Sequence, residues 1–271
     1  MSTLTDTFTL SNGVEIPQVG FGTWQIPDGD AAYDATATAL TTGYRHVDSA
    51  RAYGNEASVA RAVRDSGLAR EDVFVTTKLP AEIKDHDEAL ASFEASLADL
   101  QLDHVDLYLV HAPWPWSEMG KDCREGNIAV WTALEEIHAS GRARSIGVSN
   151  FSVADLESLT AATSVLPHVN QIRWFIGNTQ DETTAWCKER GILVEGYSPL
   201  ATGGLVDDEA IAAVAANCGR TVAQVCLKYL LQKDVLPLPK STTPSRIAEN
   251  ADLDFEISAA DLTVLDALHR D

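Results

Sequence analysis

The chain has 271 residues, of which 45% are hydrophobic, an ordinary content for a globular protein with one large α/β domain or two smaller ones. Twenty basic residues against forty acidic ones give a net charge of −20, which argues against non-specific binding to nucleic acid or to an anionic membrane. The N-terminus lacks the basic and apolar regions of a signal peptide, and no apolar stretch approaches the roughly 20 residues that span a bilayer, so a cytoplasmic protein is expected.

The cysteine content gives no sign of disulfides or of a metal site. No two cysteines form a CxxC pair, which is typical of ordinary reduced thiols. No metal is therefore expected. The cysteines are Cys123, Cys187, Cys218 and Cys226.

The chain opens with a hairpin pattern, and strand and helix patterns alternate after it. Residues 8–17 place Asn12-Gly13, the strongest short-range hairpin signal, between two short strand patterns. Strands are then expected at residues 18–24, 44–48, 73–78, 105–111, 144–150 and 168–172, within 192–200, and at 235–241. Helices are expected at residues 30–42, between 55 and 67, at 86–100, 128–140, 153–162, 179–190, 207–217 and 222–232, with two more at the C-terminus.

This alternation predicts right-handed βαβ units and a parallel sheet. Eight strand candidates at this length favour the α/β class and a closed (β/α)8 TIM barrel, which would occupy residues 1–271 as a single domain. A doubly wound Rossmann sheet is the less favoured alternative. No GxGxxG motif follows a strand, and GFGTW at residues 20–24 lacks the third glycine.

Four polar residues of complementary chemistry lie at predicted strand ends or just beyond them. Asp48 ends one strand, Tyr53 follows it on the connecting loop, and Lys78 and His111 end the next two strands. In a (β/α)8 barrel these ends meet at one face, where barrel active sites lie. Each residue alone could be a cap, a surface group or a hydrogen-bonded core histidine, but the four together favour a catalytic set.

These side chains suit proton donation to a carbonyl oxygen. A free tyrosine has a pKa of roughly 10; a nearby Lys78 ammonium would lower it, and Asp48 would hold the lysine charged and oriented. His111 could hydrogen-bond the carbonyl oxygen beside the Tyr53 phenol. None of the four is a strong nucleophile, so a cofactor that carries hydride is the expected missing part.

The motifs around these residues resemble the aldo-keto reductase family, and within it the prokaryotic 2,5-diketo-gluconate reductase-like members. They occur in family order over essentially the whole chain, and the D-x4-Y-G-N-E element is quite specific. The matching segments are GYRHVDSARAYGNE, VTTKL, LYLVH, SIGVSN, VNQI, GYSPL and LPKSTTPSRIAEN.

The resemblance implies a barrel closed at its base by the N-terminal β-hairpin. It also implies an oxidoreductase that uses NADPH to reduce aldehydes and ketones, such as small carbonyls, dicarbonyls or keto sugars, to alcohols. Tyr53 would be the general acid, Lys78 and Asp48 its tuning residues, and His111 the residue that orients the substrate. A histidine at this position points to C=O rather than C=C reduction.

Cofactor contacts follow from the same resemblance. Tyr197 is expected to stack on the nicotinamide, and fixed amide partners would preset the distance of the hydride. The residues expected along the nicotinamide, its ribose, its carboxamide and the pyrophosphate are Gly22, Thr23, Trp24, Asp48, Ser149, Asn150, Gln171, Tyr197, Ser198, Pro199 and Leu200.

The segment from Lys240 to Asn250 resembles the family's site for the adenosine 2′-phosphate. Lys240 and Arg246 supply cations that suit phosphate in a strongly acidic chain, so NADPH is expected in preference to NADH. The alternative is a capped helix start with Pro244 in its first turn. The further contacts expected here are Ser241, Thr242, Thr243, Glu249 and Asn250.

Three departures from the family pattern surround the expected substrate pocket. Pro80 and Ala112 stand where relatives commonly have tryptophan, and RWFIG at residues 173–177 replaces a more acidic segment. Trp114 or Trp174 could take the place of the lost indole, or Trp114 and Trp116 could only anchor their loop. The residues expected to contact the substrate are Trp24, Tyr53, His111, Trp114 and Trp174.

Two other functions remain open at this point. The chain could hold NADPH as a redox sensor with negligible turnover, or Lys78 could be the Schiff-base nucleophile of an aldolase on the same barrel. The pocket rather than the fold sets the substrate, so the physiological carbonyl stays open. The expected partner is a small-molecule carbonyl, with neither nucleic acid nor membrane, and the family's smaller members are often monomers.

Overall fold

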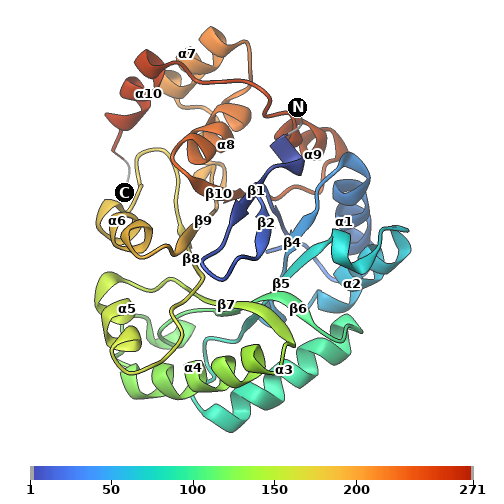
Figure 1. Ribbon diagram of the computed structural model, residues 1–271. Coiled ribbons are helices and arrows are strands. Elements are labelled where there is room, and N and C mark those ends of the chain that lie inside the picture. The colour runs from blue at the N-terminus through green and yellow to red at the C-terminus, as the bar shows by residue number, and fades with distance from the viewer. Residues whose placement is uncertain (1–2, 270–271) are drawn as a thin grey trace.

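Eight parallel strands form the centre of the computed structural model, which describes residues 3–269 (Figure 1). Each strand pairs with its neighbour in chain order. Backbone hydrogen bonds from Gly20 N to Pro237 O (3.1 Å) and from Gly22 N to Pro239 O (2.9 Å) join the first and last strands, so the barrel closes and the predicted (β/α)8 fold is confirmed. The strands are β3 (Phe21–Gly22), β4 (His46–Asp48), β5 (Phe74–Leu79), β6 (Val105–Val110), β7 (Ala143–Ser149), β8 (Val169–Arg173), β9 (Leu193–Tyr197) and β10 (Val235–Leu238).

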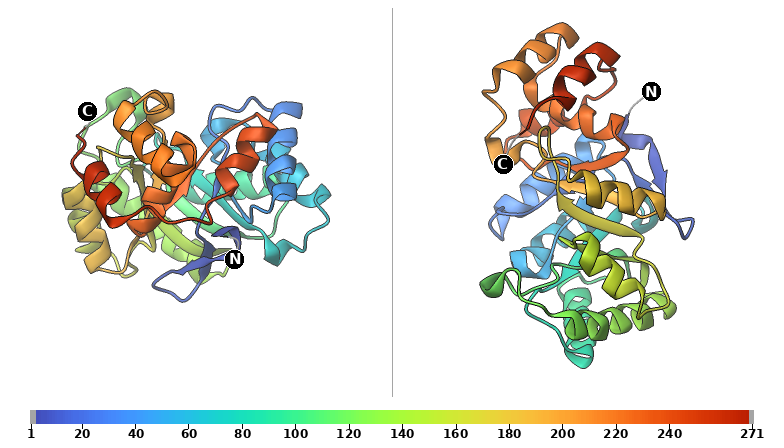
Figure 2. Two further views of the ribbon diagram at one scale, coloured as in Figure 1. Left: turned by 90° about the horizontal axis from the view of Figure 1, so that it is seen from above. Right: turned by 90° about the vertical axis from the view of Figure 1, so that its left-hand side faces the viewer.

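Helices surround these strands on the outside of the barrel (Figures 1 and 2). Strands and helices alternate as parallel βαβ units require, and two helices follow the last strand. The helices are α1 (Asp30–Thr42), α2 (Glu56–Asp65), α3 (His86–Leu100), α4 (Arg124–Ala139), α5 (Val153–Thr160), α6 (Asp181–Glu189), α7 (Glu209–Cys218), α8 (Val222–Gln232), α9 (Pro244–Ala251) and α10 (Ala259–Asp266).

The N-terminal hairpin closes the base of the barrel, as predicted. Its antiparallel strands are β1 (Thr7–Thr9) and β2 (Glu15–Pro17), which lie across the middle of the barrel in Figure 1. Leu10 and Ile16 are buried in one apolar cluster with side chains of four barrel strands. The Asn12 amide donates to Arg144 O at 3.0 Å, so the hairpin tip is tied to the start of β7.

One helix begins earlier than its sequence pattern suggests. A helix is predicted from residue 128, whereas α4 begins at Arg124. Gly126 falls in this first turn and lowers the helical signal. A Cβ atom at Gly126 would lie 2.7 Å from Cβ of Lys84, so the glycine allows the close approach of this turn to the loop before α3. The long loop after β6 is therefore shorter than predicted and rests on α4.

The core lies between the strands and the helices. Every residue of β5 and of β6 is buried, as expected for parallel strands covered on both faces. Phe93 of α3 and Trp131 of α4 are fully buried in the cluster that packs against β6. Among the described residues, no single helix is long and apolar enough to cross a membrane; α7 and α8 meet that test only as a pair joined across an 84° bend.

Candidate active site

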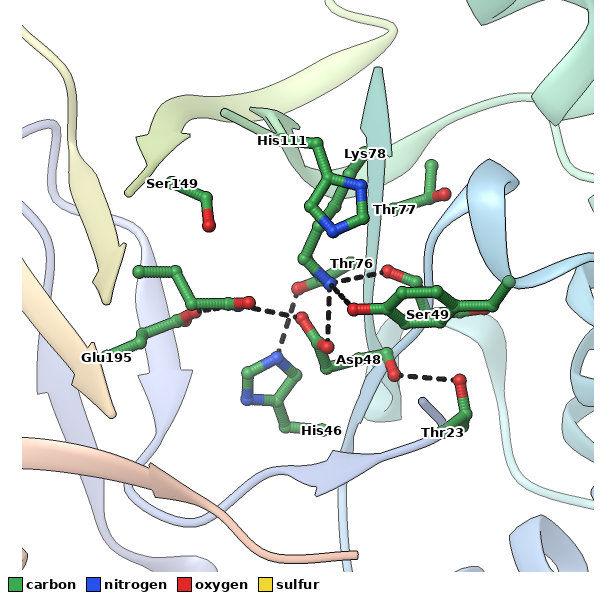
Figure 3. Close-up of polar contacts among 12 residues, drawn as sticks. Thr23, His46, Asp48, Ser49, Thr76, Thr77, Lys78, His111, Ser149 and Glu195 are labelled. Atoms are coloured by element: carbon green, nitrogen blue, oxygen red, sulfur yellow. Dashed lines mark hydrogen bonds and ion pairs between the residues drawn. The ribbon is translucent and has the colours of Figure 1, made fainter. Parts of the chain in front are cut away.

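The predicted catalytic residues lie together at the carboxyl ends of neighbouring strands (Figure 3). Asp48 is the last residue of β4, Lys78 lies near the end of β5, and His111 directly follows β6. Tyr53 ends a short 3-10 helix, Arg51–Tyr53, that follows β4. The barrel topology alone brings these four side chains to one face, because parallel strands end at the same side.

Lys78 is the centre of this group. Its Nζ atom donates to Asp48 Oδ1 at 2.7 Å, to Ser49 O at 2.7 Å and to the Tyr53 hydroxyl at 3.4 Å. These three bonds use all three protons of the ammonium group. Burial alone would lower the pKa of Lys78, but the charge of Asp48 and the Tyr53 oxygen outweigh it, so the pKa is raised and the lysine is charged.

Tyr53 keeps its proton at neutral pH. Burial raises the pKa of its phenol to about 12, although the Lys78 ammonium lowers it. The sequence leads one to expect a pKa below 10. The pKa is higher in the structure because burial destabilises the phenolate more than the Lys78 ammonium stabilises it. The phenol therefore has a proton to give, and the ammonium at 3.4 Å is placed to stabilise the anion that donation leaves.

His111 lies beside the phenol as a neutral imidazole. Its ring centroid is 5.5 Å from that of Tyr53, with the rings at 69°. Burial, with the charge of Lys78, lowers the pKa of His111 to about 3. A neutral imidazole has one N–H donor, which could hold a substrate oxygen next to the phenol.

The predicted carboxamide contacts form a connected cluster next to the catalytic set. The Asn150 amide donates to His111 O at 3.0 Å, and its Oδ1 accepts from the Tyr197 hydroxyl at 2.8 Å. Ser149 Oγ accepts from the same amide at 3.0 Å. Gln171 donates from Nε2 to Asp48 Oδ2 at 2.9 Å. These bonds fix the four side chains relative to the catalytic residues.

The loop after β3 is held against the end of β4. Thr23 N and Thr23 Oγ1 both donate to Asp48 O at 3.0 Å. The Asn55 amide donates to Thr23 O at 3.0 Å, and Ser49 Oγ donates to Asn55 Oδ1 at 3.1 Å. Asn55 was selected from sequence only as a helix start, yet its side chain ties the two loops together. A Cβ atom built on Gly22 would lie 3.5 Å from Leu238 O, 3.6 Å from Pro239 O and 3.8 Å from Lys240 Cβ, so the Lys240 segment passes close by.

The loop Ser198, Pro199 and Leu200 follows β9 directly. Ser198 has a positive φ of 50°, an uncommon conformation that turns the chain sharply beside the Tyr197 ring. Leu200 is partly buried and packs against two apolar clusters. The sequence-predicted pyrophosphate loop is therefore a defined turn at the same end of the barrel.

The segment from Lys240 to Asn250 leads from β10 into α9. Lys240 and Arg246 are exposed, and no ion pair or hydrogen bond of either side chain exists within residues 3–269. Thr243 is the N-cap residue of α9 but makes no side-chain cap bond, and Pro244 is in the first turn. Glu249 accepts from Thr221 at 2.8 Å, and Asn250 is buried. Ser241 accepts from Thr243 N at 3.0 Å, while Thr242 is exposed.

Tryptophans lie beside the catalytic set, but not all of those predicted. Trp116 contacts His111 edge to face at a centroid distance of 5.5 Å and contacts Trp114 at 5.2 Å. Trp24 is 46% exposed and follows Thr23 on the β3 loop. Trp116 was noted in the sequence only as a loop anchor. Its spacing two residues after Trp114 is the one signal that could have suggested a role beside His111.

The prediction that Trp174 lines the substrate pocket is wrong. Its side chain is 2% exposed, its indole nitrogen donates to Thr184 Oγ1 at 3.2 Å, and its ring packs against Tyr229 at 5.7 Å. It therefore belongs to the core between β8 and helices α6 and α8. The direction in which a residue just after a strand points depends on the turn there, which the sequence pattern did not specify.

Within residues 3–269, no group of three or more His, Cys, Asp or Glu side chains is arranged to hold a metal ion. The four cysteines are free thiols, two of them buried.

Comparisons with known proteins find similar sequences and structures over nearly the whole chain. The model of the Aldo/keto reductase family matches residues 18–270. A glyoxal reductase of Bacillus subtilis (strain 168) is 42% identical over 271 residues, which cover 100% of this chain and 95% of that protein. A crystal structure of an aldo/keto reductase from Brucella melitensis has a TM-score of 0.90 and 39% identity, covering 96% of this chain and 98% of that one. A Bombyx mori aldo-keto reductase in complex with NADP has a TM-score of 0.86 and 32% identity, covering 96% and 92%.

Proposed function

Because the chain belongs to the aldo/keto reductase family, we propose that it is a single-domain enzyme that uses NADPH to reduce small aldehydes and ketones to alcohols. The observation that carries this proposal is the Lys78 ammonium between Asp48 and the Tyr53 hydroxyl, with a neutral His111 beside the phenol. NADPH would supply the hydride that adds to the carbonyl carbon.

The protein's own contribution is the proton and its placement. Tyr53 gives its proton to the carbonyl oxygen as charge develops there, and Lys78 stabilises the phenolate that remains. Asp48 keeps the lysine charged and oriented through the 2.7 Å bond. His111 donates its N–H to the same carbonyl oxygen. This second hydrogen bond holds the oxygen beside the phenol, so the carbonyl carbon of the substrate points away from the phenol.

The residues present fit an NADP cofactor. Lys240 and Arg246 are exposed cations in a chain of net charge −20, and neither has an ionic or hydrogen-bonding partner among residues 3–269. Both are therefore available to bind a phosphate group. They would hold the 2′-phosphate, and Ser149, Asn150 and Gln171 would hold the carboxamide. A solved relative in complex with NADP supports the choice of cofactor. The preference for NADPH over NADH follows from the two cations.

The rim of the site supports small carbonyl or dicarbonyl substrates. Trp24 and Trp116 are 46% and 40% exposed, so apolar faces border an otherwise polar site. A relative is named glyoxal reductase, which is consistent with a small dicarbonyl. Ala112 stands where relatives commonly have a tryptophan. We propose that the Trp116 ring, which contacts His111, takes the place of that missing indole. A cytoplasmic location and a monomeric state stay predictions.

A Schiff-base aldolase is disfavoured by the same geometry. A lysine nucleophile needs a neutral amine with a free lone pair. The Lys78 side chain is 0% exposed, its three protons are all committed, and its pKa is raised. It is a charged, fixed group rather than an accessible amine.

The test is NADPH oxidation, followed by absorbance, with methylglyoxal, aromatic aldehydes, diketones and keto sugars, for wild type and Tyr53→Phe. We expect turnover in wild type and a loss of roughly 10² to 10⁴-fold in the variant, with NADPH binding retained. Tyr33→Phe, which removes an outer hydroxyl bonded to Asp65, is the matched control and should keep full activity. Tight NADPH binding without turnover in wild type would instead support the sensor function.

A further inference from the structure

A second carboxyl group is buried inside the barrel next to the catalytic set. Glu195 lies on β9 and is 0% exposed. Its Oε2 accepts from Gln171 Nε2 at 2.8 Å, and the same nitrogen donates to Asp48 Oδ2 at 2.9 Å (Figure 3). Its Oε1 is buried and has no hydrogen-bond partner among the described residues. Glu195 was not predicted from the sequence as a site residue, and it has no role in the proposed proton donation.

The local charge count places a proton on this group. Asp48 and Glu195 are two carboxyl groups that share one amide and face one ammonium, and Asp48 takes that ammonium at 2.7 Å. An ionised Glu195 would be an unpaired buried charge next to another carboxylate, which costs far more than one hydroxyl without a partner. Glu195 is therefore the neutral acid of the pair.

The groups that face Glu195 support this assignment. Burial and then the charge of Asp48 on β4 raise the pKa of Glu195 to about 8, while the Gln171 bond and the charge of Lys78 on β5 oppose them. On its other side, the residue in register on β10 is the apolar Leu236. Tyr197 is the other titratable residue on β9. Lys78 is the cation of this set, and Asp48 already pairs with it.

This arrangement fixes the amide of Gln171. Both of its amide protons point at carboxyl oxygens, so its own carbonyl oxygen is directed away from them. Gln171 is one of the proposed carboxamide contacts, and its backbone oxygen accepts from Asn150 N at 2.9 Å. Glu195 thus supports a residue of the cofactor site from behind.

We propose that Glu195 is a positioning residue that acts through Gln171 and that it loses its proton when the oxidised cofactor binds. The nicotinamide of the oxidised cofactor is cationic. Binding of the reduced cofactor, whose nicotinamide is neutral, does not release this proton. This rests on the proposed function of the site. A positive ring at this end of the barrel would stabilise the Glu195 carboxylate, and the proton passes to solvent. By linkage, affinity for NADP+ then rises with pH over the range in which Glu195 titrates, while affinity for NADPH does not.

The test is calorimetric titration of the protein with NADP+ and with NADPH near pH 8, in two buffers of different ionisation enthalpy. The readout is the number of protons released when NADP+ binds minus the number released when NADPH binds. Protons released by the 2′-phosphate, which both cofactors carry, cancel in this difference. Tyr53→Phe serves as the background, since the phenol could also lose a proton beside a cationic ring. We expect net release with NADP+ on this background and none after adding Glu195→Gln. Equal release with and without the substitution would overturn the proposal.

The cofactor affinities give a measurement that needs no variant. The ratio of the NADPH Kd to the NADP+ Kd should rise roughly tenfold between about pH 6 and about pH 9 in wild type. A ratio that stays flat contradicts the proposal whether or not the Glu195 variant folds. If neither cofactor binds wild type at any pH, the proposed function itself fails, and this outcome is distinct from a flat ratio.

Unfolding of the cofactor-free protein tests the proton on Glu195 independently. A carboxyl whose folded pKa of about 8 exceeds its ordinary 4.5 binds more protons in the folded state, so its stabilising effect is complete below pH 4.5 and is lost as pH rises towards 8. Wild type should therefore lose stability across this window relative to Glu195→Gln. Parallel stability curves would show that Glu195 is ionised throughout and would overturn the proposal.

Discussion

Two buried carboxylates at opposite ends of the barrel, Asp48 and Asp106, are paired with cations in different ways. At the base, Asp106 at the start of β6 accepts from Arg144 at 2.7 Å and from Val75 N at 2.9 Å, and pairs with Arg70 at 2.8 Å. At the other end, Asp48 accepts from Lys78 and Gln171. Both aspartates are nearly inaccessible to water.

The difference lies in where each set of contacts leads. Arg70 also donates to backbone oxygens of residues 73 and 104, so the network at the base ends in the backbone that it holds together. The network at the top leads through Lys78 to the Tyr53 hydroxyl, which has a proton to give, and lies beside His111. The same kind of ion pair therefore stabilises the fold at one end and positions reactive groups at the other, in keeping with the division of labour in such barrels.

The largest expected effect is the loss of activity in Lys78→Met. Without the ammonium, the Tyr53 phenolate has no stabilising charge, so kcat should fall roughly 10² to 10⁴-fold, measured by NADPH oxidation. Gln171 still donates to Asp48 in the variant, so far-ultraviolet circular dichroism should stay close to that of wild type. Lys188→Met, which changes an exposed lysine, is the control. Activity within tenfold of wild type would remove Lys78 from the proton-donating set.

The reciprocal change at the base is Asp106→Asn. It leaves Arg70 and Arg144 without their shared carboxylate, and since both are partly exposed we expect a loss of about 1–3 kcal/mol in the free energy of unfolding, measured with urea. Turnover of the folded variant should stay close to wild type. If kcat fell as in Lys78→Met, the contrast between the two ends would not hold.

The sequence predicts one end of this comparison better than the other. Asp48, Lys78 and His111 are foreseeable because a residue at the carboxyl end of a parallel strand reaches a common face whatever the strand register. Asp106 lies in an equally recognisable strand, but its partners Arg70 and Arg144 depend on how two other segments approach it. Such pairings follow from tertiary packing, which periodicity does not contain.

The same limit explains the other differences. The first turn of α4 was not predicted because it contains Gly126, which lowers the helical signal. The close approach of Lys84, which requires a glycine there, cannot be read from the sequence. Trp174 was predicted in the pocket because its segment departs from the family pattern there, but its ring packs against Tyr229 on the outer side of the sheet. Glu195 lies two residues before the predicted Tyr197 and was passed over because one acidic residue in an apolar strand carries no signal of its partner.

A third prediction extends the comparison to the exposed cations at the top of the barrel. Arg246→Ala should weaken NADPH binding by roughly tenfold or more and leave NADH binding unchanged, because a charge-assisted bond to the 2′-phosphate is lost. Fluorescence titration with each cofactor measures both values. Arg61→Ala, an exposed arginine on α2, controls for general charge. Equal weakening of both cofactors would mean that Arg246 does not read the phosphate.

The smallest expected effect concerns the rim, where Trp116 contacts His111 without a hydrogen bond. Trp116→Ala should raise KM for aromatic aldehydes by roughly three- to tenfold, because stacking contributes about 0.5–1.5 kcal/mol, and should change KM for methylglyoxal little. Since the Lys78 network stays intact, kcat should be retained. Met119→Ala, on the same loop and 70% exposed, is the matched control. A fall in kcat with both substrates would instead place Trp116 with the residues that position His111, and the division between a fixed proton-donating set and an adaptable rim would have to be redrawn.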